Sequence, residues 1–259
     1  MKSTIRQSLL IFFFLVGCFS IGMAQDQDQE EAYRFKKEIS FDFRMHTNGL
    51  AMGFNYGIIK SPRRSLMFQF AIASMKHPRE YKKSVEAFPG PLSRSPKAYI
   101  FGKQNYFYGL HFTAGGKHYF SEGTSRRGVS VGFNYLIGPS LGITKPYYLD
   151  LIRFSDDLNT FEIVSERYTP ENEDVFLNRG TIYGASGFTS GFSGIQVFPG
   201  GHAKLGLHFD WGVNDEFIKA IEFGVMVDAY TSKIPILVAD DNRLLFMNLY
   251  LTLQLGKRS

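Results

Sequence analysis

Charged and imidazole side chains recur at every second position in several short stretches of this sequence. They comprise Asp42, Arg44 and His46 in one stretch, His111 in another, and Lys204, His208, Asp210, Glu222 and Asp228 nearer the C-terminus. Side chains of these types can pair as ions, transfer protons or bind a metal ion. A period of two is the repeat of a β-strand, in which alternate side chains share one face. Each stretch therefore directs its polar groups to one side of a sheet.

Proton-transfer chemistry has one candidate centre, His46, which we expect at the end of its strand near Asp228 and Tyr230. A histidine beside a carboxylate can cleave or transfer a lipid acyl chain. The sequence around it contains no nucleophile elbow and no pair of histidines at metal-binding spacing, and the acidic runs at 156–157, 171–174 and 240–241 lack the ligand spacing of a calcium loop. We therefore predict that the protein is not an enzyme and has no cofactor or metal. A lipid A or phospholipid acyl-modifying enzyme is the alternative.

Eight segments alternate large apolar residues with small or polar ones, which predicts eight strands. They are residues 39–46, 50–58, 66–73, 106–113, 129–137, 202–211, 221–228 and 245–255. In the last segment every odd position from Leu245 to Leu255 is large and apolar, while Asn248, Thr252 and Gln254 lie between them. About eleven residues is the length that a tilted strand needs to cross a bilayer.

The connections between these segments favour one all-β fold over another. Those after the second, fourth and sixth segments are short, those after the third, fifth and seventh are long, and only the tight "TNG" turn at 47–49 departs from this order. The order predicts a transmembrane antiparallel β-barrel of about eight strands, with short periplasmic turns and long extracellular loops. The alternative is a secreted β-sandwich or lipocalin-like barrel, in which the apolar side would face inward.

In a membrane barrel the polar stretches would line the interior. An eight-stranded barrel has little internal space, so side chains fill it, and an unpaired charge there is costly. We therefore predict a polar network that leaves no sizeable pore, formed by Asp42, Arg44, His46, Lys204, His208, Glu222 and Asp228. A narrow conducting pore or a proton-linked site is the alternative.

The N-terminus has the features of an export signal. Lys2 and Arg6 precede an apolar run at 9–16, and small residues before position 25 fit a cleavage site. Lipidation of Cys18, which follows "LVG", is an alternative. The predicted organisation is a signal peptide at 1–24, a periplasmic tail at 25–36 and an outer-membrane barrel domain at 37–259.

Composition narrows the classes of partner and chemistry. Cys18 is the single cysteine, so cleavage after Ala24 leaves none for disulfides or thiolate chemistry. The aromatic content is 16%, which suits the aromatic girdles of membrane barrels. The formal charge is +5, and removing Lys2 and Arg6 leaves +3, too little to indicate a nucleic acid partner.

Two segments place a lysine and a proline beside apolar or aromatic residues at the outward end of a strand. Proline interrupts the pairing of strands, so each segment marks the point where a strand gives way to a loop. We expect contact with lipid headgroups, or alternatively with a partner protein, at Lys145, Pro146, Tyr147, Tyr148, Lys233 and Pro235.

The blocks "GPSLGITKPYYLDL", "AIEFGVMVDAY", "SKIPIL" and "NLYLTLQLGK" are similar to those of a family of small outer-membrane β-barrels found in Bacteroidota. The resemblance implies an outer-membrane location and a barrel, and it transfers no catalytic residue. The C-terminus departs from the common outer-membrane pattern, because it lacks a final aromatic residue and ends with Lys257, Arg258 and Ser259.

Together these features predict a structural or interaction module of the outer membrane. Its expected partners are outer-membrane lipid, lipopolysaccharide and other outer-membrane proteins. An accessory subunit of a larger outer-membrane assembly or secretion complex is the second interpretation.

Overall fold

The computed structural model describes residues 35–84, 96–120, 129–155, 160–211, 216–238 and 242–259. The predicted signal peptide, Cys18 and most of the predicted tail lie outside the described residues. In the described part of the chain, no helix combines the length and the apolar character needed to cross a membrane.

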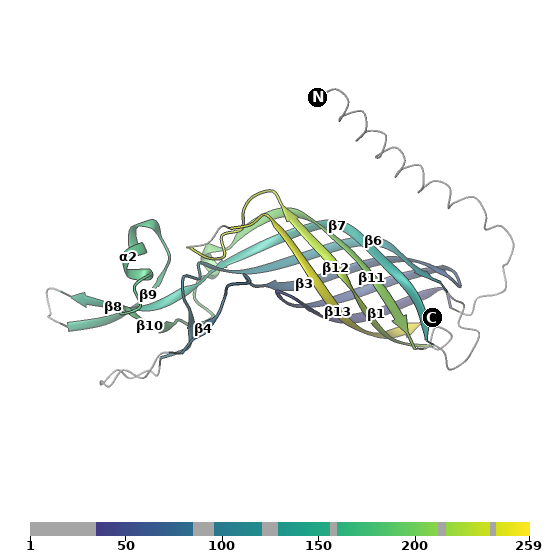
Figure 1. Cartoon of the computed structure of the whole chain (residues 1–259), viewed down its shortest axis with the longest axis horizontal. Helices are drawn as coiled ribbons and strands as arrows, with labels where there is room; N and C mark the ends of the chain where they lie inside the picture. The colour runs from purple at the N-terminus through teal and green to yellow at the C-terminus, as the bar shows by residue number, and fades with distance from the viewer. Residues whose placement is uncertain (1–34, 85–95, 121–128, 156–159, 212–215, 239–241) are drawn as a thin grey trace, which may run out of the picture. The chain divides into compact units, whose positions relative to one another are not determined.

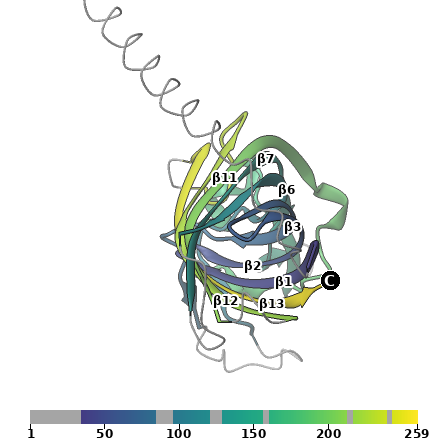
Figure 2. The same cartoon turned by 90° about the vertical axis from the view of Figure 1, so that its right-hand side faces the viewer.

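Eight antiparallel strands close into a barrel (Figures 1 and 2). In chain order they are β1 (Lys37–His46), β2 (Gly49–Ser61), β3 (Arg64–Met75), β6 (Asn105–Tyr119), β7 (Ser130–Pro146), β11 (Gln196–Asp210), β12 (Phe217–Tyr230) and β13 (Leu245–Arg258). The barrel closes where β1 pairs with β13, from Glu38 opposite Arg258 to His46 opposite Tyr250. All eight predicted strands are present, and the prediction of a closed antiparallel barrel is confirmed.

Several strands are longer than their alternating segments. The strand β6 continues through Gly115 and Gly116 to Tyr119, and β11 begins at Gln196, ahead of the predicted start at 202. Pro199 and two glycines weaken the local strand signal there. Pairing with β7 nevertheless runs from Gln196 opposite Thr144 to Asp210 opposite Ser130. Pairing with β7 therefore keeps these residues of β11 in a strand, although their own sequence does not favour one.

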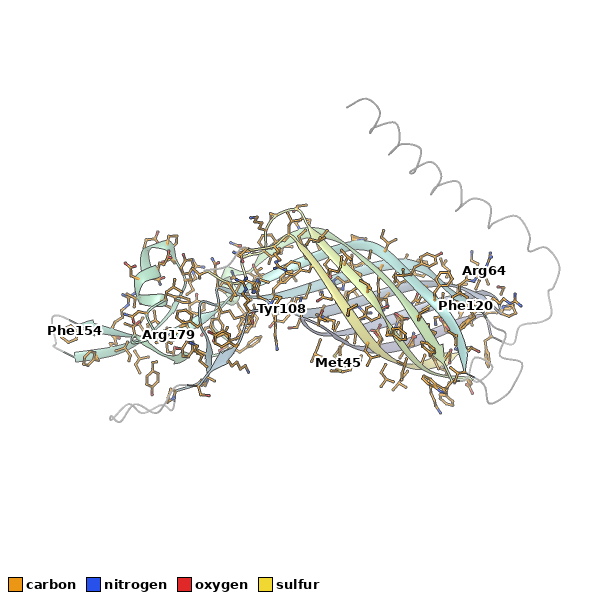
Figure 3. All side chains as sticks on the ribbon, in the orientation of Figure 1. Met45, Arg64, Tyr108, Phe120, Phe154 and Arg179 are labelled. Atoms are coloured by element: carbon orange, nitrogen blue, oxygen red, sulfur yellow. The ribbon has the colours of Figure 1, made fainter. Side chains whose placement is uncertain are left out.

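The barrel is apolar outside and polar inside. Large apolar side chains of every barrel strand are exposed on the outer surface, as Figure 3 shows for Met45 of β1. Several inward positions of β2 and β3 are glycine or alanine, among them Ala51, Gly53, Ala71 and Ala73, which leaves room for ionic side chains. A Cβ at Gly53, for example, would collide with the Asp42 carboxylate.

The two ends of the barrel carry different connections. One end, here called the terminal end, holds the first and last residues of the barrel, and there the Lys37 backbone amide donates to the Ser259 carbonyl over 2.8 Å. It also carries the connections 62–63, 120–129 and 211–216. The opposite end, here called the mouth, carries the connections 47–48, 76–104, 147–195 and 231–244.

The described residues of 76–104 and 147–195 form a folded unit that we call the loop module. Its elements are β4 (Lys82–Lys83), β5 (Tyr99–Ile100), β8 (Tyr148–Ser155), β9 (Thr160–Arg167), η2 (Pro170–Asn172), α2 (Glu173–Phe176), β10 (Ile182–Ala185) and η3 (Phe192–Gly194). Strands β10, β8 and β9 form one sheet, and β4 pairs with β5. Strands β8 and β9 pair as an antiparallel hairpin, and residues 156–159 of its turn lie outside the described residues.

The loop module has an apolar core of its own. Its buried residues come from both long connections and are Tyr99, Tyr147, Leu149, Leu151, Phe176 and Ile182. Tyr147 alone separates β8 from β7, so this sheet follows directly from a barrel strand.

Candidate functional site

Ion pairs fill the interior near the terminal end. Lys117 Nζ lies 2.8 Å from Glu38 Oε1, and Arg258 contacts both Glu38, over 3.6 Å, and Asp210. The Tyr119 hydroxyl donates to Asp210 over 3.0 Å. In the sequence, Arg258 stands out only as part of an unusual C-terminus. Its even number places it on the inward face of the last strand, and that alternation is the signal that identifies it.

A second group surrounds Arg44, whose side chain is fully buried. The guanidinium donates to Asp42 over 2.9 Å and to Gln69 over 3.0 Å. The Gln69 amide in turn donates to Asp42 over 2.8 Å and to Asn55 over 2.6 Å. This network joins β1, β2 and β3 inside the barrel and balances one buried positive charge with one negative charge.

A third group converges on Glu222 of β12. Lys204 Nζ lies 2.9 Å from its carboxylate. The Tyr250 hydroxyl and the Asn134 amide donate to it over 2.7 and 2.9 Å. His208 Nδ1 lies 3.3 Å away. Four strands therefore meet at one carboxylate, which stabilises the closed barrel as long as all partners are present.

A fourth group lies nearer the mouth and contains two histidines. His111 Nε2 and His202 Nδ1 lie 2.9 and 2.8 Å from the same oxygen, Asp228 Oδ1. The two imidazole rings stack with centroids 4.0 Å apart and an interplanar angle of 16°. His202 is absent from the network predicted from sequence, although it has the same parity as Lys204.

His46 does not complete the predicted acyl-transfer centre. The carboxylate expected beside it, Asp228, pairs with His111 and His202, and no hydrogen bond or ion pair joins it to His46 among the described residues. His46 is buried at the mouth end of β1, opposite Tyr250.

An apolar group, here called the mouth cluster, closes the interior at the mouth. It consists of Met75, Phe107, Tyr230, Ile234, Ile236, Leu237 and Phe246. The segment "SKIPIL" supplies three of these residues and is held in place by the Asn105 amide, which donates to the Pro235 carbonyl over 2.7 Å. The Gln104 backbone N–H donates to the Ile236 carbonyl over 2.8 Å. Side chains thus occupy the barrel interior from the ionic terminal end to the apolar mouth.

The six predicted rim residues divide into two groups. Lys145, Pro146 and Tyr147 are buried by the loop module. Lys145 Nζ lies 3.7 Å from the centroid of the Phe188 ring, and the Tyr147 hydroxyl accepts a hydrogen bond from the Ile100 amide over 3.1 Å. Burial raises the pKa of Tyr147 to about 12. The remaining three residues, Tyr148, Lys233 and Pro235, are at least partly exposed.

Comparison with known proteins assigns no family. No protein-family model matches the chain, and no curated protein matches it. Among solved structures, Ail, the attachment invasion locus protein of Yersinia pestis, aligns over 88% of this chain and 100% of its own with 10% identity and a TM-score of 0.40. Neisserial surface protein A aligns over 86% and 94% with 6% identity and a TM-score of 0.35. The N-terminal barrel domain of Pseudomonas aeruginosa OprF aligns over 86% and 96% with 9% identity and a TM-score of 0.32. Likeness of this degree transfers no activity or ligand.

Proposed function

We propose that this protein is an outer-membrane β-barrel with a closed interior, which presents its loop module to a partner protein. The observation that carries the proposal is the loop module itself. A barrel that only needed to span a membrane could join its strands by short turns, whereas here two long connections share one apolar core. Such a core fixes the positions of surface residues, as recognition requires.

The membrane location is supported by the arrangement of the barrel side chains. A closed barrel leaves no unpaired strand edge, which is the condition for β-structure in lipid. The outward side chains of β13, from Leu245 to Leu255, are large, apolar and exposed. Water would not favour such a surface, but outer-membrane lipid and lipopolysaccharide would contact it. The predicted export signal favours the outer membrane, with the mouth facing outward.

The closed interior argues for a role other than transport. The charges near the terminal end are paired, and the mouth cluster adds an apolar barrier. We therefore expect no large, stable conductance from the pure protein in planar bilayers. Unboiled protein should also migrate differently from boiled protein in SDS, because a closed barrel resists unfolding by the detergent.

The contact surface that we assign to the partner is the tip of the β8–β9 hairpin. Phe154 and Phe161 pair edge to face, with ring centroids 5.3 Å apart. Their exposed fractions are 53% and 70%. Exposed aromatic residues on a rigid support are frequent anchors in protein interfaces.

A photo-cross-linking residue at Phe161 tests this assignment in native membranes. We expect one reproducible cross-linked protein from position 161, and none from Phe120, an equally exposed aromatic residue at the terminal end of the barrel. A product from position 120 alone, or none from either position, would contradict the presentation of the loop module.

The same experiment addresses the second candidate function, an accessory subunit of a larger assembly. In that case the cross-linked protein co-purifies with the barrel in mild detergent without cross-linking. A partner found only after cross-linking indicates transient interaction. The proposal assigns no reaction to the protein and no nucleic acid partner.

A further inference from the structure

Three side chains of metal-binding types converge from three strands in the barrel interior. His111 of β6, His202 of β11 and Asp228 of β12 each offer one ligand atom, and these atoms lie within 4.8 Å of one another. All three side chains are fully buried. Strand register explains how they meet. His202 lies directly opposite Asp228, and His111 lies opposite Ser140 of the intervening strand β7.

Asp228 differs from the other carboxylates that line the described barrel interior. Glu38, Asp42, Asp210 and Glu222 each pair with a lysine or arginine. Asp228 pairs only with the two imidazoles. A buried carboxylate without a cation is costly, so an added positive charge beside Asp228 would stabilise the described interior.

Atoms of this group also lack partners among the described residues. Neither ring nitrogen of His111 has a hydrogen-bond partner there, although His111 Nε2 lies 2.9 Å from Asp228 Oδ1. Beside them Gly109 leaves space, because a Cβ at that position would lie 2.8 Å from His111 Nε2 and 3.3 Å from the Tyr230 hydroxyl. Buried polar groups are nearly always satisfied, by protein, water or an ion. These atoms therefore point to a ligand.

We propose that His111 Nε2, His202 Nδ1 and Asp228 Oδ1 bind one divalent transition-metal ion of the zinc class. Two imidazoles and one carboxylate suit zinc and its neighbours, rather than calcium or magnesium, which prefer oxygen ligands. Ligands about 2.1 Å from a tetrahedral zinc ion lie roughly 3.4 Å apart, so the present separations widen by roughly half an ångström on binding. A water molecule or the Tyr230 hydroxyl completes the coordination.

The ion acts as a structural cross-link inside the barrel. It joins β6 to β11 and β12 across β7, directly beneath the mouth cluster, to which Tyr230 belongs. Because the ligands are buried, the ion enters during folding rather than by diffusion into the folded barrel. Metal binding of this kind contributes directly to folding. The inference does not depend on the loop module or its partner.

Metal retention after refolding tests the site. Mature protein is refolded in detergent with Zn²⁺, passed through a chelating column, and its zinc content is measured by elemental analysis. We expect about one zinc ion per chain in the wild type, and little in His111→Ala and His202→Ala. His118→Ala is the matched control and should retain zinc, because His118 has outward parity on the same strand and stacks on Phe133 with ring centroids 5.4 Å apart.

Heat-dependent mobility in SDS identifies variants that refold. If the histidine variants fail to refold, Co²⁺ in the wild type decides the question. Refolding with Co²⁺ should give the intense visible absorption of a four-coordinate ion, and competing Zn²⁺ should abolish it. Folded wild type without zinc and without this absorption would overturn the proposal. So would equal zinc retention by His202→Ala and the wild type.

Discussion

The barrel and the loop module bury opposite kinds of side chain. In the barrel, Arg44 is fully buried while Leu251 is 52% exposed. In the loop module, Phe176 is fully buried, while the Arg153–Glu166 ion pair lies on the surface. In both regions, the side chains on the surface are those that the surrounding medium solvates. Lipid surrounds the barrel in our account and water surrounds the loop module, so a given substitution should act differently in the two regions.

The largest effect is expected from Glu222→Ala. This change leaves Lys204 buried without its counter-ion and removes the acceptor for Tyr250 and Asn134. Breaking a buried pair from one side costs about 3–5 kcal/mol. The free energy of unfolding from urea titration in detergent should fall by this amount. An unchanged value would show that water, and not the ionic network, fills the interior.

Phe176→Ala should have a comparable but confined effect. Removing a buried phenylalanine costs about 3–5 kcal/mol, here from the core of the loop module. Limited proteolysis should cut within residues 147–195 much faster than in the wild type, while the barrel keeps its heat-dependent mobility. Loss of the barrel together with the loop module would show that the two regions fold as one unit.

An arginine introduced on the outer face of the barrel should destabilise the protein more than one introduced on the surface of the loop module. Leu251→Arg places a cation on the outer face of β13, where lipid contact near the midplane makes it cost about 2–4 kcal/mol. Phe161→Arg, on the exposed tip of the loop module, should change the free energy of unfolding by about 0.5 kcal/mol or less. Refolding into lipid vesicles measures both. Equal tolerance of the two changes would place the β13 leucines away from lipid.

His46→Ala tests the remaining enzymatic hypothesis with a small effect on stability. The protein should fold normally and lose about 1 kcal/mol at most, because neither ring nitrogen of His46 has a hydrogen-bond partner among the described residues. Membrane lipid composition should be the same with the variant as with the wild type. A lipid profile changed by wild-type overproduction, and restored by His46→Ala, would favour the acyl-modifying enzyme.

The smallest effect concerns pH and the loop module. Arg153 donates two hydrogen bonds to Glu166, over 2.9 and 2.7 Å, and these bonds lower the pKa of Glu166. The stabilisation is therefore complete above the ordinary glutamate pKa of about 4.3 and is lost as the pH falls through the lowered value. Solvent screens this exposed pair, so the effect is about 1 kcal/mol or less. Proteolysis of the loop module should accelerate below pH 4.3 in the wild type, and less so in Glu166→Gln.

The alternation of side chains predicts the barrel because the period of two is a local property. It identifies all eight strands and the inward face that carries Asp42, Arg44 and Glu222. The inward face also contains His202 and Arg258. Their even sequence numbers, shared with Lys204 and Gln254, would have been enough to add both to the predicted network. The pairing of His111 and His202 with Asp228 is different, because it depends on which strands are neighbours across β7, and no spacing in the sequence encodes that contact.

The loop module could not be predicted for a related reason. Tyr99 and Tyr147 lie in separate connections without alternation, and they meet only because β3, β6, β7 and β11 bring the ends of those connections together. The lysine and proline of "SKIPIL" predict a rim contact, and that contact stays a prediction, since Lys233 and Pro235 are at least partly exposed. The pattern does not predict that the two isoleucines of this segment pack into the mouth cluster, because that burial depends on the open barrel end beside them.

Fluorescence quenching along β13 tests the inverted arrangement of the barrel most directly. Single tryptophans replace Met247, Leu251 or Leu255 in a Trp211→Phe background, and Phe161→Trp serves as the control in the loop module. In vesicles containing brominated lipid we expect quenching at all three β13 positions, strongest at 251, and no quenching by aqueous iodide at that position. Position 161 should show the reverse. Quenching of position 251 by iodide, with none from brominated lipid, would contradict a barrel whose leucines face the membrane.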